Sequence, residues 1–435
     1  MAEKISRKEL LDKWDDALNE GESPLVGYKR FVTARLMENA QDALQSGEVQ
    51  HTHGVLAEDA PTNNTAYNAN YDPVMISMLR RNAPNMVGFD LMGVIPMTGP
   101  TGTVFAIRSR YGSNAGAEAF YNESNTGVSS VRGGNTQIVG DANNNVGANV
   151  SGNAELYNYS GGMTTIQGEG LGSAGNTAIA KMAMTIEKFN VTAQTRALQA
   201  EYTQEMAQDL KAIHGLDAEK ELANILVTEL LSEINREAIR CVALTAVQGS
   251  PTTLGVTTAG TFDLDTDSNG RWMAERFAGL HFHITREANQ VAKTTRRGRA
   301  NVMLCSSDVA SALEMAKIIN VPDGAGLQVD DTGNVFAGTI GGRIRVYIDP
   351  YAGRDFMVLG YKGSHAWDAG LFYCPYTPLQ IVRGQSEDGY QPKMAFKTRY
   401  AMAANPFSAG ASVSNGALVA NTNVYYRRTL INNLM

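Results

Sequence analysis

The sequence predicts an α+β fold, in which helices and strands occupy separate parts of the chain. Three observations carry this prediction. Apolar residues recur at helical spacing over residues 218–246, strands with alternating apolar residues follow between residues 343 and 402, and residues 124–176 are rich in glycine and asparagine. Helices lie in the middle of the chain, strands lie around and after them, and no βαβ alternation occurs, which argues against a doubly wound sheet.

Length and composition limit the class of protein. At about 150 residues per domain, 435 residues predict two or three folding units. The chain has 37 basic and 44 acidic residues, and this net charge of −7 argues against a broad nucleic-acid-binding face. No apolar run approaches the ~18–20 residues of a membrane span, and no secretory signal precedes Leu10. We therefore expect a soluble protein made in the cytoplasm, with Cys241, Cys305 and Cys374 as reduced thiols and neither a disulfide nor a zinc site.

Residues 1–58 differ from the rest, because they carry seven basic and eleven acidic residues. Apolar residues at helical spacing predict two amphipathic helices, the first through Leu10, Trp14 and Leu18 and the second through Leu36. Such a segment more often docks on a partner than forms a core of its own. Polar, loop-like sequence follows from Gln50, which marks a domain boundary.

The next part of the chain predicts short elements around a long excursion. We expect a helix over Pro73–Asn82, strands over Phe89–Ile95 and Thr103–Arg108, and a strand over Met182–Val191. Residues 124–176 contain 12 glycines and only four charged residues, a density too high for a helix. We expect a two-stranded excursion with an Asn/Gly-rich tip that reaches away from the body.

The second half predicts three helices and then mainly strands. A helix through Tyr202–Ile213 ends at His214 and Gly215, Asp217 can cap the helix Ala218–Ala246, and a third helix spans Trp272–Lys293. The long helix would measure about 45 Å. Strands are expected over Arg343–Asp349, Phe356–Tyr361, Leu371–Cys374, Leu379–Val382 and Lys393–Met402.

Four short motifs suggest chemistry, and each has a simpler interpretation. Gly170–Gly175 has the GxGxxG spelling without a buried strand before it, which favours a loop over a nucleotide site. Asp265–Gly270 resembles the start of a calcium loop, but position twelve is Arg276. His281 and His283 point to different sides of a helix and lack a third ligand. Arg296–Arg299 could hold a phosphate or a neighbouring subunit's carboxylates, although a solvated turn is the simpler interpretation. We predict no catalytic residue, cofactor or metal.

Several longer blocks of sequence resemble the major capsid proteins of T-even-type contractile-tailed bacteriophages. They occur in the family's order and cover most of residues 71–407. They are Tyr71–Asn85, Gly93–Gly102, Ala207–Gly215, Glu233–Glu237, Val335–Asp349, Gly360–Gly363, Phe396–Tyr400 and Asn405–Phe407.

The resemblance implies the tailed-phage major capsid fold, with an N-terminal arm, an extended loop, a peripheral domain built on a long spine helix, and an axial domain. The family's insertion in the extended loop is usually larger than residues 124–176, so we expect no separate insertion domain here. The implied divisions are 1–58 (propeptide and scaffold-docking segment), 59–110 (N-terminal arm and first strands), 111–190 (extended loop), 191–310 (peripheral domain), 311–395 (axial domain) and 396–435 (return strand and C-terminal tail).

The resemblance also implies a function without catalysis. Copies would form hexameric capsomers of an icosahedral or prolate head shell, which encloses double-stranded DNA without sequence-specific binding. Implied partners are neighbouring capsomers, a vertex protein, a scaffold, a prohead protease, a portal and a decoration protein. Two alternatives remain: the pentameric vertex subunit of the same fold, and a nucleotide-dependent enzyme that uses Gly170–Gly175.

Family members lose an amino-terminal propeptide after a (Leu/Ile)-x-Glu motif. Leu56 and Glu58 match this motif, with Asp59 as the first residue of the mature chain, at the boundary that composition indicates. Leu18–Glu20 and Leu36–Glu38 also match, but they lie inside expected helices.

Overall fold

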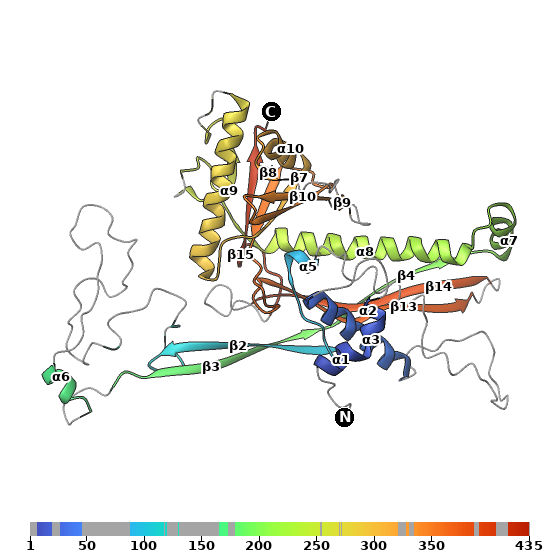
Figure 1. Cartoon of the computed structure of the whole chain (residues 1–435), viewed down its shortest axis with the longest axis horizontal. Helices are drawn as coiled ribbons and strands as arrows, with labels where there is room; N and C mark the ends of the chain where they lie inside the picture. The colour runs from blue at the N-terminus through green and yellow to red at the C-terminus, as the bar shows by residue number, and fades with distance from the viewer. Residues whose placement is uncertain are drawn as a thin grey trace. The chain divides into compact units, whose positions relative to one another are not determined.

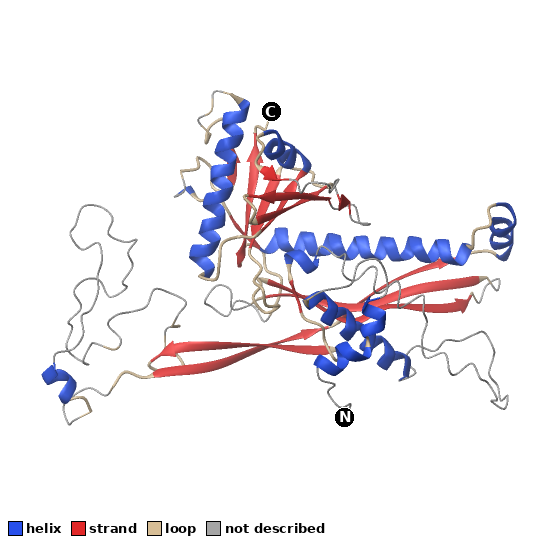
Figure 2. Cartoon of the chain, viewed as in Figure 1, coloured by secondary structure: helices blue, strands red, loops and turns tan. Residues whose placement is uncertain are grey.

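The structure, a computed structural model, describes most of the chain outside two long gaps. The described residues are 7–19, 27–45, 88–116, 118–119, 129, 165–172, 179–252, 255–268, 270, 272–320, 328–329, 335–386, 391–405 and 416–434. The chain divides into a larger unit, Met1–Gly102 with Asn190–Met435, and a smaller unit, Thr103–Phe189. Figure 1 labels many of their elements and Figure 2 colours them by type.

A 28-residue helix, α8 (Ala218–Thr245), is the longest helix described in the larger unit. Its stripe of apolar residues is buried, and the Asp217 side chain accepts a hydrogen bond from the backbone N–H of Glu219 at its start. The preceding helix, α7 (Gln204–Ile213), ends before Gly215, whose φ of +67° suits glycine. Both helices confirm the predicted periodicity to within two residues.

A four-stranded sheet packs along α8. Its order is β1-β13-β14-β4, with β1 parallel to β13 and the other pairs antiparallel. The strands are β1 (Gly93–Val94), β13 (Leu371–Gln385), β14 (Pro392–Ala404) and β4 (Gln194–Glu201). Met394, Phe396 and Tyr400 of β14 are buried and Lys397 is exposed, as their alternation predicts.

A nine-stranded mixed sheet forms the other part of the larger unit. Its order is β5-β15-β12-β7-β11-β10-β8, and β6 and β9 pair with β15 and β10. The strands are β5 (Ala246–Gln248), β6 (Thr261–Asp263), β7 (Val302–Ser306), β8 (Ile319–Asn320), β9 (Gln328–Val329), β10 (Val335–Ile340), β11 (Ile344–Asp349), β12 (Phe356–Gly360) and β15 (Asn423–Asn432). Helices α9 (Met273–Thr295) and α10 (Ser307–Met315) share one hydrophobic core with this sheet.

The N-terminal helices belong to the core of the larger unit. They are α1 (Arg7–Lys13), α2 (Asp15–Asn19) and α3 (Tyr28–Gln45), and they confirm the two amphipathic segments read from sequence. Leu10, Leu18 and Val32 are fully buried in the same cluster as α8 and the four-stranded sheet. The apolar face that we expected to dock on a partner is therefore covered by this chain's own sheet.

The smaller unit is built on a two-stranded ribbon, β2 (Thr101–Tyr111) with β3 (Met182–Thr192). The strand predicted over Met182–Val191 is confirmed. A short helix, α6 (Thr165–Glu169), lies inside the segment that we expected to contain no helix. It is only five residues long and includes Gly168.

Three expectations need correction or fall outside the described residues. The strand expected over Phe89–Ile95 is a turn of helix, α5 (Gly88–Leu91), followed by the two-residue β1. The two strands expected over residues 371–382 are one strand, β13, with its register shifted near Pro375 and Thr377. The helix expected over Pro73–Asn82 lies outside the described residues. Among the helices described, none is long and apolar enough to span a bilayer.

Candidate assembly surfaces

One face of the β2–β3 ribbon is apolar and exposed. Phe105 and Ile107 of β2 and Met182, Met184 and Ile186 of β3 expose between 55% and 69% of their surface. Alternate residues of a strand point to the same side, so the residues of each strand lie on one face. An isolated two-stranded ribbon with such a face is marginally stable in water, and contiguous exposed apolar residues mark interaction sites.

The opposite face of the ribbon carries charged side chains that form ion pairs with one another, beside the buried apolar residues Val104 and Phe189. Arg108 lies 3.3 Å from the Glu187 carboxylate and 3.5 Å from that of Glu118. Arg110 pairs with Glu187 at 3.0 Å and donates from Nε to the Thr185 hydroxyl at 3.2 Å. The charged face is therefore neutralised within the ribbon, and the apolar face is the one left for contact.

The N-terminal helices are fastened to the four-stranded sheet by specific hydrogen bonds. Tyr28 donates its hydroxyl to the Val94 carbonyl at 2.7 Å, and Asn39 donates Nδ2 to the carbonyls of Met97 and Tyr376 at 2.9 and 2.8 Å. Burial raises the pKa of Tyr28 to about 12, so its hydroxyl stays a donor. These bonds fix one position of α3 against the sheet.

The long helix α8 is joined to both sheets by ion pairs. Arg196 of β4 pairs with Glu233 at 2.8 Å and with Glu237 at 2.6 Å, and Tyr400 donates to Glu237 at 2.5 Å. Burial, and then the hydrogen bond to Glu237, raises the pKa of Tyr400. Arg236 of α8 pairs with Asp349 of β11 at 2.5 Å. These contacts orient α8 between the two sheets.

A buried polar cluster joins α9 to β15 and to the loop after β5. Ser250 Oγ lies 2.8 Å from His283 Nε2 and donates to Thr429 Oγ1 at 3.1 Å, and the Ser250 N–H donates to Glu287 at 2.8 Å. Arg427 donates Nε to the other Glu287 oxygen at 2.6 Å. Burial lowers the pKa of His283 to about 4. Because all of these side chains are at least 90% buried, the Ser–His–Glu combination is a structural network rather than a nucleophile open to substrate.

Sequence reasoning missed this cluster. Of its residues, the sequence singled out only His283, as a possible metal ligand. Ser250 and Thr429 are 179 residues apart in the chain, so spacing could not connect them. The His283 and Glu287 pair at i, i+4 was the one local signal.

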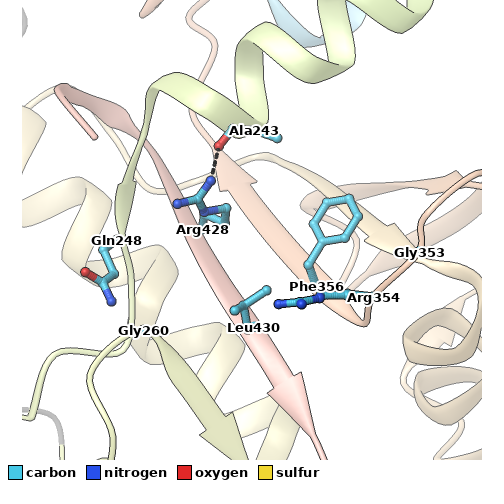
Figure 3. A pocket seen from close by; sticks show the side chains of 8 residues that line it. All are labelled: Ala243, Gln248, Gly260, Gly353, Arg354, Phe356, Arg428 and Leu430. Atoms are coloured by element: carbon cyan, nitrogen blue, oxygen red, sulfur yellow. Dashed lines mark hydrogen bonds between the residues drawn. The ribbon is translucent and has the colours of Figure 1, made fainter. Parts of the chain in front are cut away.

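An open pocket of about 640 Å³ lies between the end of α8 and the nine-stranded sheet (Figure 3). Arg428 donates to the Ala243 carbonyl at 2.9 Å in its wall. Its lining residues are Ala243, Gln248, Gly260, Gly353, Arg354, Phe356, Arg428 and Leu430.

The acidic and glycine motifs singled out from sequence have structural roles where they are described. Asp267 accepts hydrogen bonds from Thr257 and Asp263, and Asp265 pairs with Arg276. In the part of the chain that the structure describes, no group of three His, Cys, Asp or Glu side chains is placed to hold a metal. Gly170–Gly172 form a turn after α6, and the rest of that motif lies outside the described residues.

The other predicted site residues are separated from one another. His281 and His283 both lie on α9, where His283 is buried and His281 is half-buried. Arg296 caps α9 in a left-handed conformation, and Arg297 lies 4.0 Å from Asp368. The three free cysteines are buried. Leu56, Glu58 and Asp59 lie outside the described residues.

Comparison with known proteins shows which family the chain belongs to. The family model for the major capsid protein Gp23 matches residues 68–431. The major capsid protein of Serratia phage KSP90 is 38% identical over 458 aligned residues, which cover 100% of both chains. The capsid vertex protein of Enterobacteria phage T4 is 26% identical and covers 54% of this chain and 55% of its own. The capsid of Myoviridae phage XM1 has a TM-score of 0.38 at 11% identity and covers 79% of this chain and 91% of that chain.

The family model spans most of the chain, and relatives that cover the whole chain, such as that of phage KSP90, are major capsid proteins, whereas the vertex protein covers about half of it. The chain therefore belongs to the family of the major capsid protein Gp23, as a structural protein of the phage head shell and not an enzyme.

Proposed function

We propose that this chain assembles into hexameric capsomers in which the β2–β3 ribbon of one copy lies across its neighbour. In the terms of the tailed-phage capsid fold, the ribbon is the extended loop, α8 is the spine helix of the peripheral domain and the nine-stranded sheet is the axial domain. This axial domain differs from the expected 311–395, because β5, β6 and β7 precede residue 311, β15 follows residue 395 and β13 belongs to the four-stranded sheet. The observation that carries the proposal is the exposed apolar face of the ribbon, because its polar face is already neutralised.

Charge substitution on the ribbon tests this role. Met184→Glu would bury a carboxylate in the contact, and we expect the yield of assembled shells to fall by at least about tenfold. Ala183→Glu, on the same strand but on the polar face, is the matched control and should assemble like the unaltered chain. Normal shells from Met184→Glu would contradict the proposed position of the ribbon.

We also propose that a prohead protease removes residues 1–58 by cutting between Glu58 and Asp59. Two other (Leu/Ile)-x-Glu matches are poor substrates, since Leu36 and Glu38 are buried within α3 and Leu18 is fully buried in α2. Because proteases cut exposed, extended segments, the burial of these two matches disfavours them as cleavage sites.

Removal of α1–α3 would uncover the sheet carbonyls that Tyr28 and Asn39 now bind, and this gives maturation a physical basis. The loss would make shell expansion irreversible and would clear interior space for the genome. Glu58→Gln should keep the full-length mass and a compact shell. Normally matured heads that lack residues 1–58 in this variant would exclude the site.

Further partners follow from this role. A separate vertex protein at the fivefold positions, a scaffold, a portal and a decoration protein would complete the head. The DNA inside would meet a surface without sequence-specific contacts, because acidic residues outnumber basic ones in the full chain (44 against 37) and after removal of residues 1–58 (33 against 30).

A further inference from the structure

The two faces of the nine-stranded sheet are covered differently. Helices α9 and α10 bury one face, where Met303, Cys305 and Val346 belong to their core. Phe356 of β12 and Leu430 of β15 are cross-strand neighbours, and strand alternation places both on the opposite face. Both side chains are only half-buried. They line the pocket beside the end of α8, so part of this face lacks a cover within the described chain (Figure 3).

The pocket combines an apolar wall with two guanidinium groups. Arg428 uses its terminal nitrogens on the Ala243 carbonyl and on Asn421. Arg354, in the turn between β11 and β12, is exposed and has no hydrogen-bond or ion-pair partner among the described residues. Such a pocket suits a glutamate or aspartate side chain. Its carboxylate can pair with the guanidinium, and its CH₂ groups can pack against the apolar wall.

A surface with the complementary character lies on α10. Asp308, Ser311, Glu314 and Met315 are exposed, whereas the helix buries Val309 and Leu313 against the sheet. Met315 exposes 63% of its surface. Within the described residues, neither Asp308 nor Glu314 has an ion-pair partner.

These two surfaces lie on opposite faces of one sheet, so a single copy cannot bring them together. Two copies arranged head to tail can, and such a heterologous contact repeats until a ring closes. We propose that the Arg354 pocket of one copy receives the outer face of α10 of the next copy, with Glu314 paired to Arg354 and Met315 against Phe356 and Leu430. The proposal rests on the capsomer proposed above and names the contact between its neighbouring nine-stranded sheets.

A charge swap in the full-length chain tests the contact. Arg354→Glu and Glu314→Arg should each lower the yield of capsomers and shells by at least about tenfold, because like charges then meet. The double variant should recover most of the yield. Arg343→Glu is the control: Arg343 is also exposed but lies at the opposite end of the sheet, in the turn between β10 and β11.

The outcomes separate this contact from assembly in general. A double variant that assembles no better than the single variants overturns the pairing, and so does an Arg343→Glu defect equal to that of Arg354→Glu. If the unaltered chain forms no capsomers, the proposed capsomer fails instead.

Crosslinking keeps the contact testable if a charge variant does not fold. Chains with Arg354→Cys and chains with Glu314→Cys are mixed, assembled and treated with a short bis-maleimide. We expect crosslinked dimers from the mixture and none from either chain alone, since the native cysteines are buried. Assembled mixtures without crosslinked dimers would overturn the contact.

Discussion

Arg427 of β15 and Glu287 of α9 form an ion pair at 2.6 Å, in which the Glu287 side chain is completely buried. Ser250 donates to the second oxygen of the same carboxylate, so both oxygens are occupied. The pair therefore joins α9, β15 and the loop after β5 at one point in the interior.

Loss of Arg427 should be costly, because it would leave a buried carboxylate without its cation. We expect Arg427→Ala to lower the free energy of unfolding by about 3–5 kcal/mol, measured by urea denaturation of the unassembled chain. Arg383→Ala is the matched control, since the Arg383–Glu219 pair is exposed and should contribute less than about 1 kcal/mol. Equal effects of the two variants would contradict the importance of burial.

His283 makes stability depend on pH in a defined window. Burial holds the pKa of His283 near 4, with Arg286 and Arg427 adding to the decrease and Glu287 and Asp267 opposing it. The unfolded chain, with a His pKa of about 6.5, binds the proton more readily, so stability is full above pH 6.5 and falls as the pH drops toward 4.

The His283 contribution should amount to about 3 kcal/mol across this window. Denaturation midpoints of the unassembled chain between pH 4 and 7 measure it. His283→Gln should flatten the dependence, and His214→Gln, at an exposed position after α7, should leave it unchanged. An unchanged slope in His283→Gln would show that another group titrates.

The three thiols should be unreactive in the folded chain. Burial raises the pKa of Cys241 to about 11 and those of Cys305 and Cys374 to about 12, which keeps the reactive thiolate scarce at neutral pH. Treatment with iodoacetamide at pH 7.5, followed by intact mass, should find no modified cysteine before denaturation and three afterwards. Rapid labelling of the native chain would indicate an opening of the core.

Asn39 should control how firmly the N-terminal segment is held. Asn39→Ala removes two hydrogen bonds to sheet carbonyls, and we expect it to destabilise the docked segment by about 1–3 kcal/mol. Limited proteolysis of the full-length chain should then cut within residues 1–58 faster. Asn19→Ala, an exposed asparagine of α2, is the control and should be cut at the original rate.

Local patterns predicted the elements but not their partners. Three local signals predicted the bounds of α7 and α8, and the structure confirms them. They are the apolar periodicity of α8, the Asp217 cap at its start and the glycine after α7. Amphipathicity showed that residues 1–45 bury a face, yet it could not show against what, because Asn39 meets Tyr376 across 337 residues of sequence.

For the candidate surfaces, too, the sequence predicted the local elements but not the contacts between distant segments. The two strands of the ribbon were predicted separately, over residues 103–108 and 182–191, whereas the excursion expected over residues 124–176 lies almost entirely outside the described residues. The division of the ribbon into an apolar and a neutralised face needed the pairing of Arg108 and Arg110 with Glu187. Strand β15 and the Arg354 pocket went unpredicted, since both depend on pairing with distant segments.

Imaging of particles that contain this chain, combined with the intact mass of the same sample, tests the central claim most directly. We predict closed shells with sixfold capsomers, in which the ribbon of each copy crosses its neighbour and the dominant chain begins at Asp59. DNA-filled, expanded shells built from chains that begin at Met1, or shells whose ribbons contact no neighbour, would contradict this account.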